Sequence, residues 1–473
     1  MNVLVFGLGL VGGGLAAAKY YLQKGDFVRV TDLKEEKAFP ASQINEIRRR
    51  GGELIFGTHR LEDFQWADLV VRNAAIRDDN PYLEHCRSIT TDLVCLLSSP
   101  LVKSIGIIAV TGSKGKTTTA TSISHLLTRN DMETLICGNM GISGYTVLTE
   151  LEKRAKHHDK MPRFICIEFS SWNIRDAFNP PLKDYPVFSA TVITNLLEDH
   201  LNYYKDFESY AREKLLIAQA PTRVIICPDE LKTRILDIYP KLKTEFLSLE
   251  GLYQKLDTDN LKVEPRFFTS FAVCKSLGLT KAKMLSAHKT FSEQEHRSEF
   301  VGYADNVLFI NDSSATIPSA VLYTISSMKG YAITLICGGT DKNLSPAPFI
   351  EVINKVGPII LLDGTFTREK LIPLLLEKQR AYEGPFETMG LALKCAFAKS
   401  KELADSKLSM FQYIVLSPGA ASFELFENEL DRGRQFKNEA VKIIKKHGGE
   451  HVGLLNLGEL EAFLKKLFSS VKS

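Results

Sequence analysis

The stretch AVTGSKGKTTTA, residues 109–120, decides how the central part of the chain folds. An apolar strand pattern leads into it and a helical pattern follows it, with glycines at the turn between them. In such a turn, backbone N–H groups can donate to a phosphate, and the helix dipole favours its negative charge. Only Ser113 and Lys114 separate Gly112 from Gly115, so the motif is shorter than the familiar G-x-x-x-x-G-K-[ST] loop. The stretch therefore predicts a short phosphate-binding loop.

Two side chains at the start of the predicted helix complete this candidate nucleotide site. Lys116 is placed to reach the outer phosphates, and the Thr117 hydroxyl to bind Mg²⁺. The alternative is a glycine-rich turn that carries a surface lysine.

A second glycine-rich turn lies near the N-terminus, in VFGLGLVGGG. Gly7, Gly9 and Gly12 stand in G-x-G-x-x-G register after a strand pattern, and Asp32 ends the next strand pattern. The glycines allow a phosphate to approach the backbone, and the carboxylate can accept hydrogen bonds from a ribose or a base. NAD, another nucleotide and simple tight-turn packing all remain open for this motif.

Short apolar runs alternate with helical stretches almost from end to end, which predicts a doubly wound α/β architecture. A chain of 473 residues suggests about three domains at roughly 150 residues each. A polar stretch at 96–104 and the resumption of strands near residue 292 give candidate boundaries. We expect a Rossmann-like domain at 1–98, a P-loop-type ATP-binding domain with a parallel sheet at 99–292, and a Rossmann-like domain at 293–473.

Composition narrows the class of protein. With 44% hydrophobic and 24% charged residues and no apolar run of membrane-spanning length, the chain is expected to be globular and not inserted in a membrane. The N-terminus lacks a signal-peptide pattern, so a cytoplasmic location is expected. A net charge of +3 without a basic stripe argues against nucleic acid as a partner. The eight scattered cysteines, without a C-x-x-C pair, are expected to be reduced core residues.

Acidic and imidazole side chains follow two strand patterns downstream of the phosphate loop. Glu168 ends the first, and Glu198, Asp199 and His200 follow the second. Carboxylate and imidazole groups at adjacent strand ends suit divalent cations beside a triphosphate, although capping or salt-bridged residues are the alternative. Lys214 in YAREKLL, taken by itself, reads as a solvated surface lysine.

Four polar side chains in the third predicted domain lie in or beside predicted strand ends and turns: Arg297, Asp312, Lys342 and Ser422. Together they suit a domain that closes over a nucleotide and an anionic substrate. Ordinary turn chemistry would explain any one of these loops.

With these motifs the chain resembles the ATP-dependent Mur ligases, most closely their D-glutamate-adding branch. The resemblance spans nearly the whole chain and rests on these stretches: TGSKGKTTT, IEFSSWNI, TNLLEDHLNYY, YAREK, EHRSE, INDSSAT, GGTDK and LSPGAASFELFENELDRGRQF. It implies an ATP-dependent ligase of peptidoglycan synthesis, acting in cell-wall biogenesis, cell shape and cell division. It also implies that the N-terminal domain holds a UDP-sugar substrate and not NAD.

Residue roles follow from the resemblance. Lys116 would hold the outer phosphates, Thr117 and Glu168 a first Mg²⁺, and His200 a second Mg²⁺ together with Lys214, carbamylated by CO₂. The residues expected to contact ATP are Gly112, Ser113, Lys114, Gly115, Lys116, Thr117, Thr118, Arg297 and Asp312. Those expected to contact UDP-N-acetylmuramoyl-L-alanine or D-glutamate are Gly7, Gly9, Gly12, Asp32, Asn139, Ser170, Lys342, Ser422 and Phe423.

The implied chemistry makes an acyl phosphate on the lactoyl-L-alanine carboxylate, which the D-glutamate amine then attacks with loss of phosphate. Two Mg²⁺ ions and a lysine would bring two anions together, and closure of the third domain would complete the site. We expect a monomer.

Several positions depart from the family pattern. RNAAI at 72–76 replaces the usual Ser-Pro-Gly turn, Ser314 stands where many relatives have lysine, and Glu429 stands where an aromatic residue is usual. Lys114 is a candidate for the missing cation, and the stretch 261–272 lacks the usual adenine-binding asparagines. The alternatives are a related Mur or folylpolyglutamate-type ligase that adds another amino acid to a UDP-muramoyl or folate-like acceptor, a degenerate nucleotide-binding protein, and a nicotinamide oxidoreductase.

Overall fold

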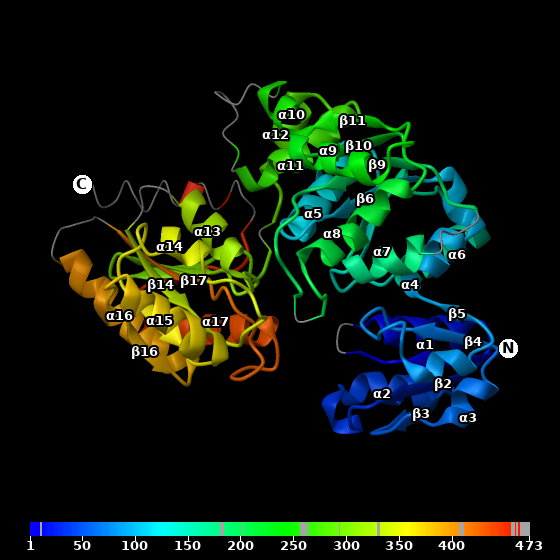
Figure 1. Ribbon diagram of the computed structural model, residues 1–473, viewed down its shortest axis with the longest axis horizontal. Helices are drawn as coiled ribbons and strands as arrows, with labels where there is room; N and C mark the ends of the chain where they lie inside the picture. The colour runs from blue at the N-terminus through cyan, green and yellow to red at the C-terminus, as the bar shows by residue number, and fades with distance from the viewer. Residues whose placement is uncertain are drawn as a thin grey trace. The chain divides into compact units, whose positions relative to one another are not determined.

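The computed structural model describes residues 1–9, 12–179, 184–201, 203–255, 263, 265–292, 294–328, 332–405, 411–455, 459 and 462–463. They form two compact units, each considered by itself below. The first consists of Met1–Leu196 and Ala211–Met284, and the second of Leu197–Tyr210 and Leu285–Ser473. Two sheets lie in the first unit and one in the second, and all three are mainly parallel, as expected for an α/β chain (Figure 1).

The N-terminal sheet of the first unit is parallel, in the order β3-β2-β1-β4-β5. Its strands are β1 (Asn2–Phe6), β2 (Phe27–Asp32), β3 (Glu53–Phe56), β4 (Leu69–Arg72) and β5 (Ile89–Thr90). Its helices are α1 (Gly13–Gln23), α2 (Ala41–Arg49), α3 (Leu61–Trp66) and α4 (Asp92–Ser98). Strand β1 is central and buried on both faces, which explains its nearly continuous apolar run.

The second sheet of this unit is also parallel, in the order β11-β10-β9-β6-β8-β7. Its strands are β6 (Gly106–Thr111), β7 (Thr134–Gly138), β8 (Phe164–Glu168), β9 (Phe188–Ile193), β10 (Val224–Cys227) and β11 (Glu245–Ser248). The helices between residues 116 and 288 are α5 (Lys116–Thr128), α6 (Gly144–His157), α7 (Ser171–Phe178), α8 (Phe207–Leu215), α9 (Asp229–Ile238), α10 (Leu249–Lys255), α11 (Phe268–Ser276) and α12 (Lys281–His288). The carboxyl ends of β6 and β8 lie side by side, which brings the phosphate loop next to Glu168.

The sheet of the second unit has the order β16-β15-β14-β17-β13-β12-β18. Its strands are β12 (Glu299–Ala304), β13 (Val307–Asn311), β14 (Ala332–Cys337), β15 (Ile359–Leu362), β16 (Glu383–Phe386), β17 (Gln412–Leu416) and β18 (Glu450–His451). Strand β12 runs antiparallel to both of its neighbours, and the other pairs are parallel. The helices are α13 (Pro318–Ser327), α14 (Pro348–Val352), α15 (Ile372–Glu377), α16 (Met389–Asp405) and α17 (Glu429–Lys446).

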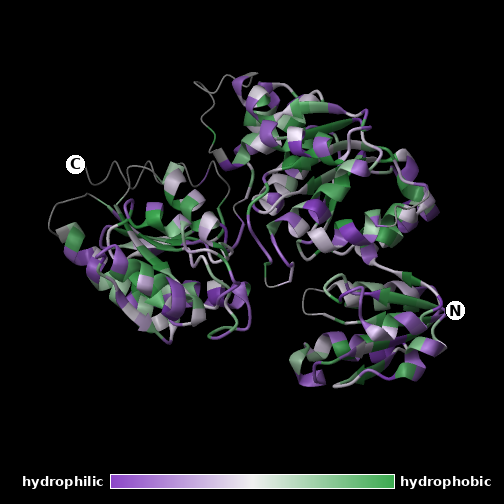
Figure 2. Cartoon of the chain, viewed as in Figure 1, coloured by the Kyte–Doolittle hydropathy of each residue, from purple (hydrophilic) through white to green (hydrophobic). Residues whose placement is uncertain are grey.

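Both faces of this last sheet are covered. Leu335 and Ile336, neighbours on β14, belong to two different buried apolar clusters, because successive side chains point to opposite faces of a strand. Figure 2 shows the strands as mostly hydrophobic, with hydrophilic residues gathered on helices and loops. The alternation of apolar runs in the sequence therefore reflects strands buried on both sides.

Short helices complete the described part of the chain. They are 3₁₀ helices at Glu36–Ala38, Pro81–His85, Pro100–Ser104, Leu216–Gln219 and Pro265–Phe267, and a π-helical turn at Thr367–Leu371. The stretch 96–104, where the sequence suggests a boundary, consists of the end of α4 and the 3₁₀ helix that follows it. The domain boundaries at residues 98 and 292 stay predictions. Among the described residues, no helix is long and apolar enough to cross a membrane.

Candidate functional site

The predicted phosphate loop joins β6 to α5, and the two residues after β9 hold it. The Thr194 hydroxyl donates to the Lys114 carbonyl at 2.6 Å, and the Lys114 N–H donates to Asn195 Oδ1 at 2.9 Å. The Ser113 N–H also donates to the Asn195 carbonyl at 3.1 Å. A Cβ atom at Gly112 would lie 2.0 Å from Thr194 Oγ1, so only glycine fits there. Because Thr194 and Asn195 are remote in sequence, their support of the loop was not predicted.

Helix α5 begins at Lys116, directly after the loop. Gly115 caps it in the left-handed conformation and, as a glycine, supplies no side-chain cap to the first turn, which includes Thr117 and Thr118. Lys116 folds back so that its Nζ donates to the Ser113 carbonyl at 3.0 Å. A helix N-terminus beside a lysine and a hydroxyl is suited to a phosphate.

Glu168 occupies the end of β8, beside β6, with only 1% of its surface exposed. Its Oε1 accepts a hydrogen bond from Asn139 Nδ2 at 3.3 Å, whereas Oε2 is buried without a hydrogen-bond partner among the described residues. A buried carboxylate oxygen is unfavourable unless it is hydrogen-bonded or coordinates a cation. This oxygen therefore fits a divalent cation bound next to the phosphate loop.

Lys214 is buried, with 2% of its surface exposed, so the prediction from its local sequence of a solvated surface lysine is wrong. It lies on α8, and its Nζ donates to the Gly112 carbonyl at 3.2 Å. The reason is tertiary, since α8 follows β9 and packs this side chain against the phosphate loop. The structure thus brings together the loop, Lys214 and, through the neighbouring strand, Glu168.

His200 belongs to the second unit, so its joint role with Lys214 in metal binding stays a prediction. It adopts a left-handed backbone conformation with φ of 56°, and its N–H donates to Asp199 Oδ1 at 2.9 Å. Lys342 Nζ lies 3.7 Å from the same Asp199 oxygen and donates to Thr316 Oγ1 at 3.3 Å. Two of the predicted loops therefore meet within this unit.

The N-terminal glycines adopt the positive φ angles that their motif requires, at 90° for Gly7, 67° for Gly9 and 89° for Gly12. Residues 10 and 11 lie outside the described residues. Both oxygens of Asp32 accept backbone hydrogen bonds, Oδ2 from the Gly9 N–H at 3.2 Å and Oδ1 from the Lys34 N–H at 3.0 Å. Asp32 therefore orients the turn itself, and its contact with a substrate stays a prediction.

Two side chains of the stretch RNAAI (72–76), which departs from the family pattern, point to different places. The side chain of Asn73 faces the glycine turn, since a Cβ atom on Gly9 would lie 2.7 Å from Asn73 Nδ2. Arg72 points elsewhere and forms a buried ion pair with Asp176 on α7, while it also donates to the Ile76 carbonyl. Asn73 is thus a member of this stretch whose side chain lies at the glycine turn.

Ser170, Ser422 and Phe423, which are expected to contact substrates, differ in their burial and in the elements that carry them. Ser170 is the N-cap of α7, where its hydroxyl accepts the Asn173 N–H at 3.1 Å. Ser422 is buried, but Phe423 beside it is 68% exposed. Ser422 follows Ala421, which pairs with Thr340 by two backbone hydrogen bonds of 3.0 Å. This pairing ties the loop after β17 to the loop that carries Lys342.

Asp312 is buried, and its oxygens are engaged within the second unit. Oδ1 accepts the Ser298 N–H at 3.2 Å, and Oδ2 accepts the hydroxyls of Thr324 at 2.6 Å and Ser417 at 2.9 Å. Burial raises the pKa of this carboxyl, against the hydrogen bonds, which lower it. Asp312 therefore holds the turn that carries Arg297, and a contact with ATP stays a prediction.

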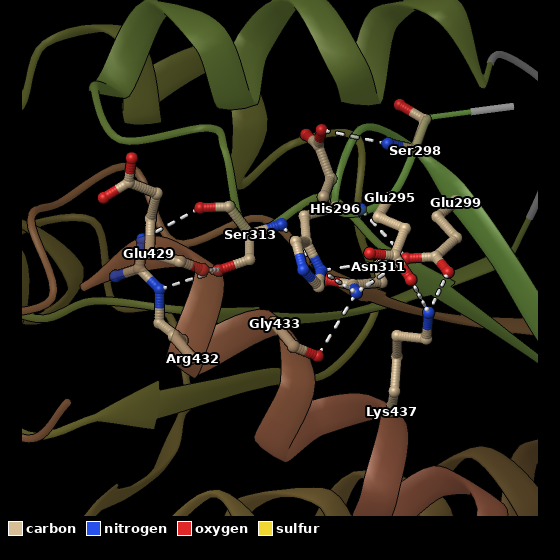
Figure 3. A network of polar contacts seen from close by, with 11 residues as sticks. Glu295, His296, Ser298, Glu299, Asn311, Ser313, Glu429, Arg432, Gly433 and Lys437 are labelled. Carbon is tan, nitrogen blue, oxygen red and sulfur yellow. Dashed lines mark hydrogen bonds and ion pairs between the residues drawn. The ribbon is translucent and has the colours of Figure 1, made fainter. Parts of the chain in front are cut away.

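Arg432 on α17 is a residue that the sequence analysis missed. It is completely buried, and its guanidinium donates to Ser313 Oγ, the Ser313 carbonyl and the carbonyls of Ala420 and Ala421 at 2.9 to 3.3 Å. Burial lowers its pKa to about 9. Figure 3 shows Arg432 beside Ser313, and the Glu429 backbone carbonyl accepts the Ser313 hydroxyl at 2.7 Å. Its only sequence signal is the DRG triplet at the start of a helix.

Comparison with known proteins agrees with this arrangement. Residues 110–285 match the Mur ligase middle domain. A UDP-N-acetylmuramoylalanine–D-glutamate ligase of Borreliella afzelii is 32% identical over 466 residues, which cover 92% of this chain and 97% of that protein. The ligase of the same name from Treponema pallidum is 27% identical, with 94% and 98% covered.

Solved structures share the fold at lower identity. The UDP-N-acetylmuramate-alanine ligase of Thermotoga maritima matches with a TM-score of 0.53 and 16% identity, over 93% of this chain and 99% of that one. The MurF ligase of the same organism, solved in complex with ADP, matches with a TM-score of 0.51 and 14% identity, over 88% and 95%. From its nearly full-length similarity to the curated ligases, the chain belongs to the Mur ligase family.

Proposed function

We propose that the chain is an ATP-dependent ligase that joins D-glutamate to UDP-N-acetylmuramoyl-L-alanine in peptidoglycan synthesis. The observation that carries this proposal is the buried Glu168, with one carboxylate oxygen unbonded, beside a phosphate loop against which Lys214 is buried. The names of the curated relatives and their nearly full-length coverage support the choice of substrates. The enzyme would act in the cytoplasm, and as a monomer.

The reaction needs a carboxylate to be activated, because oxide is a poor leaving group. The γ-phosphoryl group of ATP moves to the lactoyl-L-alanine carboxylate, ADP leaves, and an acyl phosphate results. The D-glutamate amine attacks that carbonyl, loses a proton and expels phosphate. Lys116 would hold the transferring phosphoryl group, and the N–H groups at the start of α5 would hold the neighbouring phosphates.

Thr117 and Glu168 would hold one Mg²⁺, which neutralises phosphate oxygens when bound. If its amine were carbamylated, Lys214 would support a second ion with His200, because carbamylation converts the cation into an anion. The burial of Lys214 next to the Gly112 carbonyl supports a role for this side chain at the phosphate loop.

In the N-terminal part, Asn73 and the glycine turn would contact the UDP-sugar, together with Asp32. Lys342, Ser422 and Phe423 would receive D-glutamate. We place the domain boundaries at residues 98 and 292, so that each domain contains one of the three sheets.

The test is phosphate release from ATP in the presence of UDP-N-acetylmuramoyl-L-alanine and a panel of amino acids. We expect release with D-glutamate and none with L-glutamate, L-lysine or meso-diaminopimelate. Release with a different amino acid would assign Ser314 and Glu429 to a changed specificity, and no release with any of them would refute the proposal.

A further inference from the structure

The turn that carries Arg297 has an unfavourable backbone. His296 and Ser298, on either side of Arg297, have φ angles of 64° and 52°. Residues other than glycine are disfavoured in this left-handed region and persist there only where their surroundings enforce it. The position of Arg297 therefore depends on the groups that hold its two neighbours.

Two buried carboxylates hold the turn by its backbone amides. Glu299 Oε2 accepts the His296 N–H at 2.9 Å, and Asp312 Oδ1 accepts the Ser298 N–H at 3.2 Å. A carboxylate in this role must itself be fixed, and Asp312 is fixed by two hydroxyls. Glu299 is fixed in a different way, by a cation from another element.

That cation is Lys437 on α17, whose Nζ lies 2.6 Å from Glu299 Oε1 and 2.8 Å from Glu295 Oε1 (Figure 3). Glu299 is buried, whereas Glu295 is largely exposed, so the Glu299 pair is the one shielded from water. Asn311 Nδ2 donates to Glu299 Oε2 at 3.0 Å, which leaves each oxygen of Glu299 with a defined donor.

The same helix approaches the His296 ring closely. A Cβ atom on Gly433 would lie 2.2 Å from His296 Nδ1, so glycine is required for this packing. Asn311 Nδ2 lies 2.9 Å from the same nitrogen and 3.3 Å from the Gly433 carbonyl. Helix α17 is thus joined to the turn through both the Glu299 carboxylate and the His296 ring.

We propose that Glu299 and Lys437 are positioning residues that fix Arg297 for contact with the phosphates of ATP. The inference depends on the proposed function in one respect only, the contact of Arg297 with ATP. Removing the Lys437 charge would leave Glu299 buried without its ion-pair partner, and the turn would relax away from its left-handed conformation. Arg297 would then no longer be fixed in one position, and nucleotide binding would weaken.

The experiment measures the equilibrium affinity for trinitrophenyl-ATP, a fluorescent nucleotide, in full-length variants. We expect the dissociation constant to rise about tenfold in Lys437→Met, which corresponds to about 1.4 kcal/mol. Lys437→Arg should restore most of the affinity, because it keeps a cation beside Glu299. Lys442→Met is the matched control, since Lys442 lies on the same helix, is exposed and pairs only with Glu439 in the described residues.

A second comparison separates positioning from general stability. In an Arg297→Met background, Lys437→Met should cause no further loss of affinity, because the residue that it positions is gone. An equal loss in both backgrounds, or a lower melting temperature with unchanged affinity, would overturn the inference. These measurements need no amino acid substrate, so a failure of D-glutamate to release phosphate would refute the proposed function and leave this test intact.

Discussion

Replacing Arg432 by methionine tests whether a single buried guanidinium holds the loops of the second unit together. Methionine fills much of the same space but donates no hydrogen bond. The Ala421 carbonyl keeps a second donor, the Thr340 N–H, whereas the carbonyls of Ser313 and Ala420 lose the only donor that the structure records for them. Each orphaned buried acceptor costs about 1–3 kcal/mol, so we expect a loss of about 3 kcal/mol.

Hydrogen exchange measured by mass spectrometry is the suitable assay. Both tryptophans of the chain, Trp66 and Trp172, lie in the first unit, so tryptophan fluorescence would miss unfolding of the second. We expect the slowest amides of β13 and β17 to exchange about a hundredfold faster in Arg432→Met, as follows from about 3 kcal/mol.

The matched control is Arg434→Met, two positions along the same helix. Arg434 is 55% exposed and forms one ion pair of 3.5 Å with Asp431, so its loss should change stability by less than about 1 kcal/mol. If Arg432→Met and Arg434→Met accelerate exchange equally, the guanidinium does not hold these loops and the reasoning from its hydrogen bonds is refuted.

Three further predictions concern the first unit and the Arg297 turn. Lys116→Ala should reduce phosphate release at least about a hundredfold with an unchanged circular dichroism spectrum, and near-normal turnover would show that the loop does not bind the reacting phosphate. Lys214→Ala should also lose most activity; partial recovery on adding short carboxylic acids would support carbamylation, and full activity without them would exclude it. Burial lowers the pKa of His296 below 6.5, so the folded protein takes up this proton at lower pH than the unfolded chain does. The neutral His296 ring therefore makes its full contribution to the free energy of unfolding above pH 6.5, and this contribution is lost as the pH falls toward the folded-state pKa. His296→Gln should reduce the loss of amide protection between about pH 7.5 and about pH 5.5, measured by hydrogen exchange corrected for the intrinsic exchange rate.

Local patterns predicted much of the fold and of the candidate nucleotide site. The apolar runs became strands because parallel strands buried on both faces need continuous apolar sequence. The glycine spacing predicted the turn after β6, since a tight strand-to-helix turn needs positive φ at defined positions. Glu168 followed from the same reasoning, because polar residues at the carboxyl end of a buried parallel strand lie at the edge where ligands bind.

Other features depend on residues far apart in the chain. Nothing in YAREKLL distinguishes Lys214 from a solvated lysine, because its burial arises where α8 meets a loop about 100 residues earlier, at Gly112. Arg432 reads as one more charge on an amphipathic helix, yet its guanidinium donates inward to three backbone carbonyls and to the Ser313 hydroxyl. Such partners cannot be read from spacing, because hydrogen bonds to carbonyls depend on the path of the backbone and not on side-chain identity.

The sequence by itself determined the α/β class, the phosphate loop with Lys116, and membership in a family of ATP-dependent ligases. Local chemistry is sufficient there, since glycine conformations and strand burial act over a few neighbouring residues. Only the tertiary structure decided that Lys214 is buried, that Asn73 faces the glycine turn while Arg72 turns to Asp176, and that α17 holds the Arg297 turn. These outcomes depend on which elements the fold packs together, because the cost of burying a charge or strained backbone is offset only by partners from elsewhere in the chain.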